Sequence, residues 1–217
     1  MAKKIGRYRF AKPFEGDFAP FLDRMRQDGE DIVSHEFSSL TVDGGDFYAT
    51  SLYQSAFVNG KFSGCDFSKS FWDDCLFQNC SFANCAFGGA CLRNVCAGSC
   101  KFSGCAFEET VFKDFCCSEC VFQYANFNEA CFDGMKLFRT RLAGCGFSDC
   151  KMKRAVFEEA DFLDCSFLKT SLGGCDLTQS VIKGIILSKD FQELRGAILT
   201  AGQAADLVKS MGIIVQS

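Results

Sequence analysis

Residues 57–87 read FVNGKFSGCDFSKSFWDDCLFQNCSFANCAF, and every fifth residue in this stretch is a large aromatic one. The same frame continues without a slip from Phe37 to Leu187, always on an apolar residue, and only Ala97 and Cys117 are small. A period of five fits neither a helix nor a half-buried strand, whose side-chain periods are 3.6 and 2. Strict repetition at a fixed period instead predicts a solenoid, whose units bury their apolar faces by stacking on one another.

The residue two places before each central position is mostly small, and eleven of the 16 cysteines lie there. The other three positions of each pentad are largely polar. Each pentad is therefore expected to point one large and one small side chain inward and three side chains outward. In the inward column a thiol acts as a small hydrophobic group.

Pentads such as Cys65-Asp66-Phe67-Ser68-Lys69 resemble those of the pentapeptide-repeat family. The resemblance implies an all-β solenoid, a right-handed quadrilateral β-helix with roughly 20 residues per coil, capped by short helices. Residues 36–187 would then form about eight coils. Residues one coil apart would stack into a core ladder of Phe47, Phe67, Phe87, Phe107, Phe127, Phe147, Phe167, Cys65, Cys85, Cys105, Cys145 and Cys165. Bridging stacked cysteines would strain such a ladder, so reduced thiols are expected.

The flanks do not follow the five-residue frame. Residues 1–35 are expected to be an N-terminal cap, with Asp17 as the N-cap of a helix that runs through Pro20 to Arg26 and ends at Gly29. Residues 188–217 are expected to contain a helix over 201–210, N-capped by Thr200, and a short strand over 213–215. This apolar tail serves either as a simple cap or as a dimer interface. The candidate interface residues are Leu207, Val208, Met211, Ile213, Ile214 and Val215.

The C-terminal sequence, Glu193 to Leu199 followed by a helix and Met211 to Val215, is similar to the ending of Qnr-type quinolone-resistance proteins. That resemblance implies a cytoplasmic homodimer that resembles duplex DNA and binds a type II topoisomerase, DNA gyrase or topoisomerase IV. Loops that often interrupt the pentads of Qnr-type proteins have no counterpart in this unbroken frame. A structural or scaffold solenoid that binds an unrelated protein, with no gyrase activity, is therefore the alternative.

Charge points to one side of the predicted square. The chain has a net charge of −4, and residues 36–187 hold 18 acidic and 13 basic side chains. One face of the square would carry the candidate partner-binding residues Asp46, Asp66, Glu108, Glu109, Glu129 and Asp149. Either this is a solvated surface, or it attracts a basic partner by complementary potential. A basic cluster of Arg139, Arg141, Lys151, Lys153 and Arg154 opposes it, but an acidic chain is not expected to bind nucleic acid directly.

The sequence does not indicate an enzyme. Its one histidine, His35, lies at the junction of cap and repeats, and no phosphate-binding loop or nucleophile motif is present. No cofactor and no metal are expected. No membrane attachment is expected either, because nothing resembles a signal peptide or a spanning segment. Cys91, Cys96, Cys116 and Cys131 fall at outward positions. A thiol-based redox or metal protein is thus a third hypothesis beside the two interaction roles.

Overall fold

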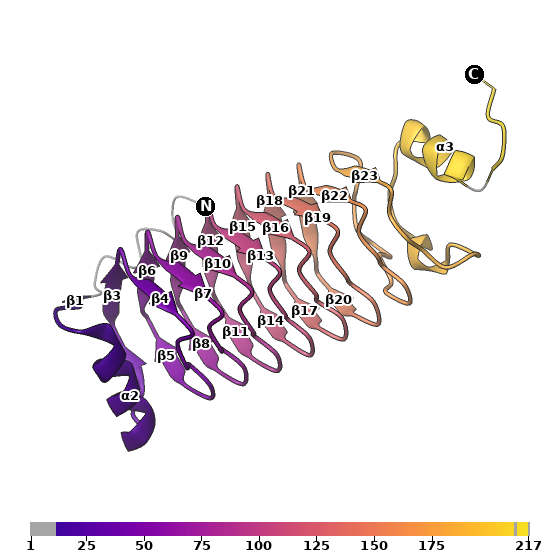
Figure 1. Ribbon diagram of the computed structural model, residues 1–217. Coiled ribbons are helices and arrows are strands. Elements are labelled where there is room, and N and C mark those ends of the chain that lie inside the picture. Colours follow the sequence, from indigo (N-terminus) through magenta and orange to yellow (C-terminus); the bar gives the residue numbers. More distant parts are fainter. Residues whose placement is uncertain (1–11, 211, 217) are drawn as a thin grey trace.

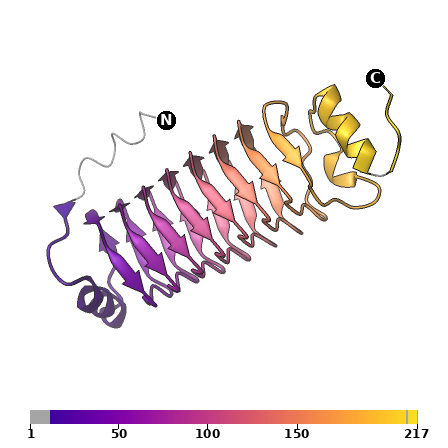
Figure 2. The same ribbon diagram turned by 45° about the horizontal axis from the view of Figure 1, so that its top comes forward.

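The computed structural model describes residues 12–210 and 212–216, and its repeat region is a parallel β-solenoid of about nine turns (Figure 1). Each strand pairs with the strand 20 residues further on, as Phe62 does with Phe82 and Phe82 with Phe102. Four pentads therefore make one coil. The strands of successive coils lie one above another along a straight rod (Figure 2). The predicted all-β solenoid with helical elements at both ends is confirmed.

Three of the four sides of the rod are parallel sheets. Face 1 contains β1 (Lys12–Pro13), β3 (His35–Ser38), β6 (Ala56–Val58), β9 (Leu76–Gln78), β12 (Cys96–Gly98), β15 (Cys116–Ser118), β18 (Lys136–Phe138) and β21 (Val156–Glu158). Face 2 contains β4 (Thr41–Asp43), β7 (Lys61–Ser63), β10 (Ser81–Ala83), β13 (Lys101–Ser103), β16 (Val121–Gln123), β19 (Arg141–Ala143), β22 (Asp161–Leu163) and β23 (Val181–Lys183). Face 4 contains β2 (Ile32–Val33), β5 (Ser51–Tyr53), β8 (Phe71–Asp73), β11 (Cys91–Arg93), β14 (Val111–Lys113), β17 (Cys131–Asp133) and β20 (Lys151–Lys153).

The third side, which follows face 2 and precedes face 4 along the chain, is built from turns and is called the turn face. It has single parallel bridges in place of strands, from Asp46↔Asp66 to Ser166↔Ile186. In most coils a backbone hydrogen bond closes a turn on this side. The N–H of the third residue after the central Phe donates to the carbonyl oxygen of that Phe, as Thr50 N does to Phe47 O at 3.1 Å. The turn face therefore repeats one backbone geometry coil after coil.

From Ser34 to Gly174 the second residue after each central position lies in the left-handed region of the backbone, with φ between about 45° and 80°. Asn, Asp and Gly adopt this conformation most readily, and they hold many of these corners. Gly144, at φ +62°, has a second reason to lack a side chain. A Cβ atom there would lie 2.7 Å from Cδ1 of Tyr124, which covers the glycine from the neighbouring coil.

A column of phenylalanine rings fills the core behind the turn face. The rings from Phe47 to Phe167 stack at centroid distances of 4.3, 4.7, 4.7, 4.8, 4.8 and 5.1 Å. All seven are almost fully buried, as are the five thiols that precede them. Burial of one such ring stabilises the fold by up to about 3 kcal/mol, so this stack is a major part of the stability.

The buried thiols pack as small groups against backbone carbonyls. Cys65 Sγ lies 3.6 Å from the carbonyl oxygen of Val42 and 3.5 Å from that of Ser63, and the same pair of contacts recurs along the column. Desolvation by burial raises the pKa of Cys75 to about 12 and that of Cys150 to about 11. Such thiols hold their protons at neutral pH and are poor nucleophiles.

Helix α2 (Phe18–Asp28) covers the N-terminal end of the rod. Asp17 is its N-cap and accepts from Ala19 N at 3.3 Å, and Gly29 ends it in the left-handed conformation, as predicted. Phe18 packs against Phe37 and Phe47, so the helix shields the first aromatic rings of the core. Strand β1 was not predicted from the sequence; it extends face 1 by pairing with β3. The first eleven residues of the predicted cap lie outside the described residues.

The C-terminal end departs from the regular coil. Asp176 pairs with Ile198, a step of 22 residues rather than 20, and η2 (Gln192–Leu194) lies in the longer segment. The ladder thus continues past Leu187, beyond the expected eight coils. Helix α3 (Ala201–Ser210) follows, and Thr200 is its N-cap: Thr200 Oγ1 accepts from Gln203 N at 3.2 Å, while Gln203 Oε1 accepts from Thr200 N at 2.8 Å. The predicted strand over 213–215 is wrong, because those residues have no ladder partner.

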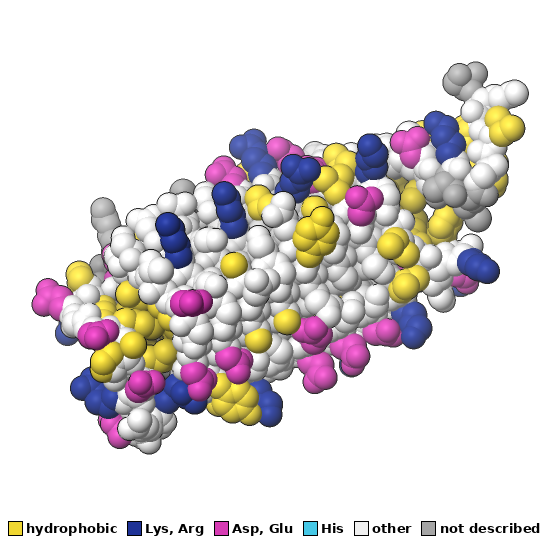
Figure 3. All heavy atoms as spheres, in the orientation of Figure 1, with side chains coloured by type: hydrophobic (Ala, Val, Ile, Leu, Met, Phe, Trp, Pro, Cys, Tyr) yellow, Lys and Arg dark blue, Asp and Glu magenta, His cyan; other side chains and the backbone are white. Residues whose placement is uncertain are grey.

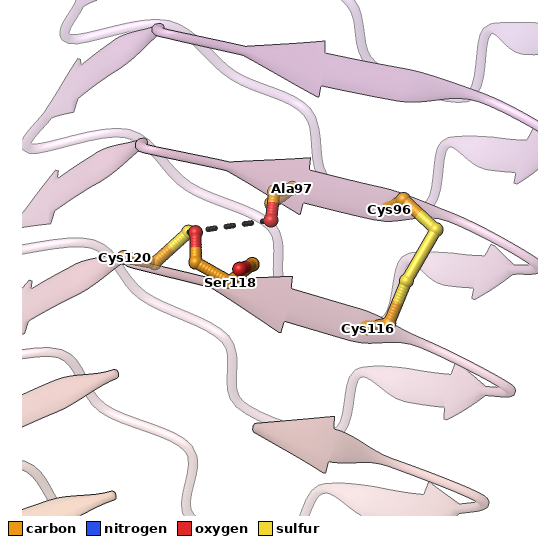
Figure 4. Close-up of a disulfide and its surroundings, with 5 residues drawn as sticks. All are labelled: Cys96, Ala97, Cys116, Ser118 and Cys120. Atoms are coloured by element: carbon orange, nitrogen blue, oxygen red, sulfur yellow. Dashed lines mark hydrogen bonds between the residues drawn. A yellow bond between two sulfur atoms is a disulfide. The ribbon is translucent and has the colours of Figure 1, made fainter. Parts of the chain in front are cut away.

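One disulfide corrects the expectation of reduced thiols. Cys96 and Cys116, from the adjacent strands β12 and β15, are joined across a Cα–Cα distance of 4.7 Å (Figure 4). That distance is within the range that a disulfide spans. Both side chains point away from the core. On this outer side no stacked ring limits their rotation. They are nonetheless buried, in a small apolar cluster with Ala56 and Leu76. The other 14 cysteines form no disulfide.

Candidate functional site: an acidic column on the turn face

Glu109, Glu129 and Asp149 occupy the same corner of three successive turns on the turn face and are called the acidic column. Their φ angles are 57°, 62° and 56°, and each backbone N–H donates to the coil above, as from Glu129 N to Ser148 O at 2.9 Å. Parallel strands lie ~4.8 Å apart, so the three carboxylates project from an evenly spaced line. Figure 3 shows a row of acidic side chains along the lower edge of the rod.

Glutamate is a costly residue at such a corner. A left-handed backbone conformation destabilises a residue that has a side chain by roughly 1–2 kcal/mol relative to glycine. Repulsion between neighbouring carboxylates adds to that cost. No stabilising partner of Glu109 or Glu129 offsets it: among residues 12–210 and 212–216, neither side chain forms a hydrogen bond or an ion pair. This pair of carboxylates is therefore open to an external cation.

The other predicted acidic residues are engaged within the chain. Asp46 forms an ion pair with Arg26 of α2 at 2.6 Å, and Asp149 forms one with Lys169 at 3.5 Å. Asp66 accepts from Ser68 N at 2.8 Å, and Glu108 accepts from Asn126 Nδ2 at 2.5 Å. Glu108 still lies next to the acidic column and adds to its negative potential.

The six predicted residues do not form one continuous patch. The coil that carries Phe87 places Ala86, Gly88 and Gly89 at the outward positions of the turn face, so it contributes no charge. Asp46 and Asp66 lie on the N-terminal side of this neutral coil. Glu108, Glu109, Glu129 and Asp149 lie on its C-terminal side. The candidate site is accordingly the second group alone.

A buried carboxylate closes the C-terminal end of the turn face. Glu193 is 1 % exposed and accepts from Lys169 N at 2.9 Å and from Ser188 N at 3.2 Å, as well as from the Ser188 hydroxyl. Burial alone raises the pKa of Glu193, but the hydrogen bonds from Ser188 and Lys169 outweigh it and leave the pKa below its usual value. Glu193 was not predicted from the sequence, because it lies in a charged segment outside the five-residue frame.

The predicted basic cluster is dispersed over three sides of the rod. Arg139 pairs with Glu159 at 3.0 Å, and Arg154 pairs with Asp133 at 2.7 Å. Arg141 is on face 2, whereas Lys151 and Lys153 are on β20 of face 4. These residues do not present one concentrated surface to an anionic polymer.

The candidate dimer residues are divided between two environments. Leu207 is 9 % exposed, beside a groove that Ile182 and Ile185 also line, so it faces its own rod. Ile213, Ile214 and Val215 are 51 %, 88 % and 38 % exposed. Met211 lies outside the described residues. Val208 is half-buried, so among the described candidate residues those after α3 offer the most exposed apolar surface.

The part of the chain that the structure describes contains no group of three or more His, Cys, Asp and Glu side chains placed to hold a metal ion. His35 stacks against Phe37 with a centroid distance of 5.7 Å, so its ring contributes to the packing of the N-terminal end. No helix between residues 12 and 216 has the length and apolar character needed to span a bilayer.

Comparison with known proteins agrees with this geometry. The profile of the family described as pentapeptide repeats matches eight copies within residues 61–96, 100–137 and 140–179. A trypsin-treated form of QnrB1, a plasmid-mediated fluoroquinolone resistance protein, is similar with a TM-score of 0.51 and 21% identity, over 83% of this chain and 99% of that chain. HetL, a pentapeptide repeat protein involved in heterocyst differentiation regulation in the cyanobacterium Nostoc, gives a TM-score of 0.33 and 14% identity, over 82% and 95%. No curated protein sequence matches the chain.

Proposed function

We propose, from the premise that the chain belongs to the pentapeptide-repeat family, that it is a non-enzymatic protein whose turn face binds a cationic protein surface. The acidic column is the observation that carries this proposal. Two of its carboxylates have no partner within the described residues, and they stand on a backbone that repeats from coil to coil. A cationic partner of matching shape gains from this charge without reorganising the rod.

The partner that fits best is the DNA-binding surface of a type II topoisomerase, DNA gyrase or topoisomerase IV. One strand of duplex DNA has a phosphate every ~3.4 Å along the helix axis, and the column has a carboxylate every ~4.8 Å. The whole chain has a net charge of only −4, so any mimicry of DNA is confined to this stripe. The fold shared with QnrB1 is compatible with this role, since QnrB1 is a fluoroquinolone resistance protein.

The experiment is a DNA supercoiling assay with purified gyrase, with and without a fluoroquinolone, over a titration of the full-length protein. The test variant is Glu109→Lys/Glu129→Lys/Asp149→Lys. The control variant, Asp43→Lys/Glu119→Lys/Glu158→Lys, makes the same change in net charge on faces 1 and 2. We expect the wild type and the control to inhibit gyrase or protect it from the drug, and the test variant to do neither. Equal activity of the wild type, the test variant and the control variant would show that the acidic column does not bind gyrase.

Absence of any effect by the wild type would favour the alternative of a scaffold solenoid with an unrelated protein partner. A pull-down that recovers one specific protein, and loses it with the test variant, would then assign the same surface to a different ligand. Recovery that is equal for wild type and test variant would place the binding surface elsewhere on the rod.

The second part of the proposal is a homodimer joined at the C-terminal ends. Ile213, Ile214 and Val215 form an exposed apolar segment that a second copy would cover with its own equivalent segment. Sedimentation equilibrium of wild type and of Ile213→Ser/Ile214→Ser measures the oligomeric state. The proposal expects a dimer that becomes a folded monomer in the variant. A wild-type monomer at all concentrations would contradict it.

A further inference from the structure

A groove of about 540 Å³ runs along the outer side of face 1 beside the disulfide. Cys116, Lys136 and Val156, from three adjacent strands, lie along it. Asp114 and Gly134 border it on the corner that precedes face 1, and Phe138 and Glu158 border it on the opposite side. The groove is far from the acidic column, since face 1 and the turn face are opposite sides of the rod.

The two sulfurs of the disulfide differ in their access to this groove. Cys116 lines it, whereas Cys96, one strand away on β12, is not among its described lining residues. Both cysteines also belong to the apolar cluster with Ala56 and Leu76, so contact with the groove is what distinguishes them. A molecule in the groove would therefore reach the sulfur of Cys116 first.

The charged side chains of the groove indicate what that molecule carries. Lys136 and Glu158 are exposed, and neither forms an ion pair or a side-chain hydrogen bond with another described residue. Lys136 is suited to a carboxylate and Glu158 to an ammonium group. Val156 adds an apolar contact between them. A small zwitterion with a sulfur atom matches these features, and a short cysteine-containing peptide is such a molecule.

We propose that this groove binds a low-molecular-weight peptide thiol, which exchanges with the Cys96–Cys116 disulfide at Cys116. The thiolate of the ligand attacks Sγ of Cys116, the Cys96–Cys116 bond breaks, and Cys96 leaves as a thiolate that takes up a proton. The product is a mixed disulfide between the ligand and Cys116. A second ligand thiolate attacks the ligand sulfur of this bond and releases the ligand disulfide and Cys116 thiolate. The net reaction oxidises two ligand thiols and reduces one protein disulfide, and it runs in reverse with the ligand disulfide.

This exchange breaks and re-forms a covalent link that spans one complete coil of the rod, because Cys96 and Cys116 are separated by 20 residues. The cysteines of the aromatic core do not compete in it, because they pack inside the rod; Cys117 borders the groove, but its side chain is fully buried. Cys91 and Cys131 on face 4 are partly exposed and do compete. The experiments therefore use the full chain with Cys91→Ser and Cys131→Ser as the background.

The first measurement compares the two sulfurs. Cys96→Ser and Cys116→Ser variants of the background protein each retain one cysteine of the pair, and each is treated with oxidised glutathione. Intact mass and peptide mapping follow the added glutathionyl group. We expect Cys116 to react at least ~10-fold faster than Cys96, because only Cys116 lines the groove. Equal rates would contradict the assignment of Cys116. So would failure of the Cys96–Cys116 disulfide to form when the background protein, with both cysteines present, is treated with oxidised glutathione.

The second measurement separates binding from simple exposure. In the Cys96→Ser protein, Lys136→Gln should slow the reaction with oxidised glutathione ~3-fold or more, through loss of the carboxylate partner. The same substitution should leave the reaction with the uncharged bis(2-hydroxyethyl) disulfide unchanged. Lys101→Gln, an exposed lysine on face 2, should change neither. Reduction of the intact disulfide by glutathione should also saturate with concentration, and a strictly linear dependence with no effect of Lys136→Gln would overturn the binding site.

Discussion

At the scale of single residues, the inward and outward positions of a pentad are under different constraints. Inward, Phe107 stacks between Phe87 and Phe127 with centroid distances of 4.7 and 4.8 Å. Outward, Glu109 two residues later stands in a left-handed corner with no partner among the described residues. The first residue serves stability. The second lowers stability, and on our account it is there for binding.

Replacement of Phe107 by Ala should lower the free energy of unfolding by about 3–5 kcal/mol. The substitution removes five ring contacts and leaves a cavity between coils that cannot collapse, because the backbone ladder fixes their spacing. Urea unfolding followed by circular dichroism measures the change, with Glu109→Ala as a control that should alter stability little. A midpoint for Phe107→Ala equal to that of the wild type would contradict the stacked core.

Glu193 should make the stability of the C-terminal end depend on pH. Its pKa is lower in the folded chain than its usual value, because Ser188 and Lys169 donate to the ionised form. The stabilisation is therefore complete above the unfolded pKa and is lost as pH falls through the folded pKa. Thermal unfolding from about pH 7 to about pH 3 should show a smaller loss for Glu193→Gln than for wild type. If the thermal stability of the two proteins falls equally with pH, the Glu193 carboxylate does not contribute to the pH dependence of stability.

Residue-level prediction from sequence was effective where the five-residue frame applied. The frame alone indicated which Phe and Cys side chains turn inward. It could not reveal that Cys96 and Cys116 form a disulfide, because outward cysteines one coil apart look the same in sequence whether bonded or free. It also could not reveal Glu193, whose partners are contributed by a segment that has left the frame.

At the scale of elements, local signals were sufficient where a helix has a cap of its own. Asp17 and Thr200 predicted the two helix starts, and Gly29 predicted the end of the first helix. The strand expected over 213–215 failed because β-branched residues form strands only when a neighbour supplies hydrogen bonds. No ladder partner faces these residues. Strand β1 was missed for the opposite reason: Lys12–Pro13 has little strand character, but the edge of face 1 offers it a partner.

Gln203 should be the main link between α3 and the last coil. Its side-chain amide donates to Leu177 O at 2.8 Å and to Ser180 O at 2.7 Å, in addition to its part in the helix cap. Gln203→Ala should therefore raise amide hydrogen exchange across residues 201–210 by ~10-fold or more, with no change over residues 61–163. Lys209→Ala, in the same helix but exposed, serves as the control. Unchanged exchange in Gln203→Ala would mean that α3 is held by its apolar side alone.

At the scale of the whole molecule, repetition makes the rod a regular support for charge. The turn face repeats one turn geometry, so acidic residues at the same corner of consecutive coils are aligned without any further device. The neutral coil at Phe87 and the pairing of Asp46 with Arg26 limit this charge to the C-terminal half of the face. The sequence indicated the face but not this limit, because the ion pair joins the capping helix to the repeats.

The most direct test of the central claim is the affinity of the full-length protein for gyrase holoenzyme, measured by surface plasmon resonance over a series of salt concentrations. The account predicts that wild type and the Asp43→Lys/Glu119→Lys/Glu158→Lys control bind alike and that binding weakens as salt rises. It predicts that Glu109→Lys/Glu129→Lys/Asp149→Lys loses at least ~100-fold in affinity, since three attractive contacts become repulsive. Equal binding by all three proteins, or binding that does not depend on salt, would contradict the claim.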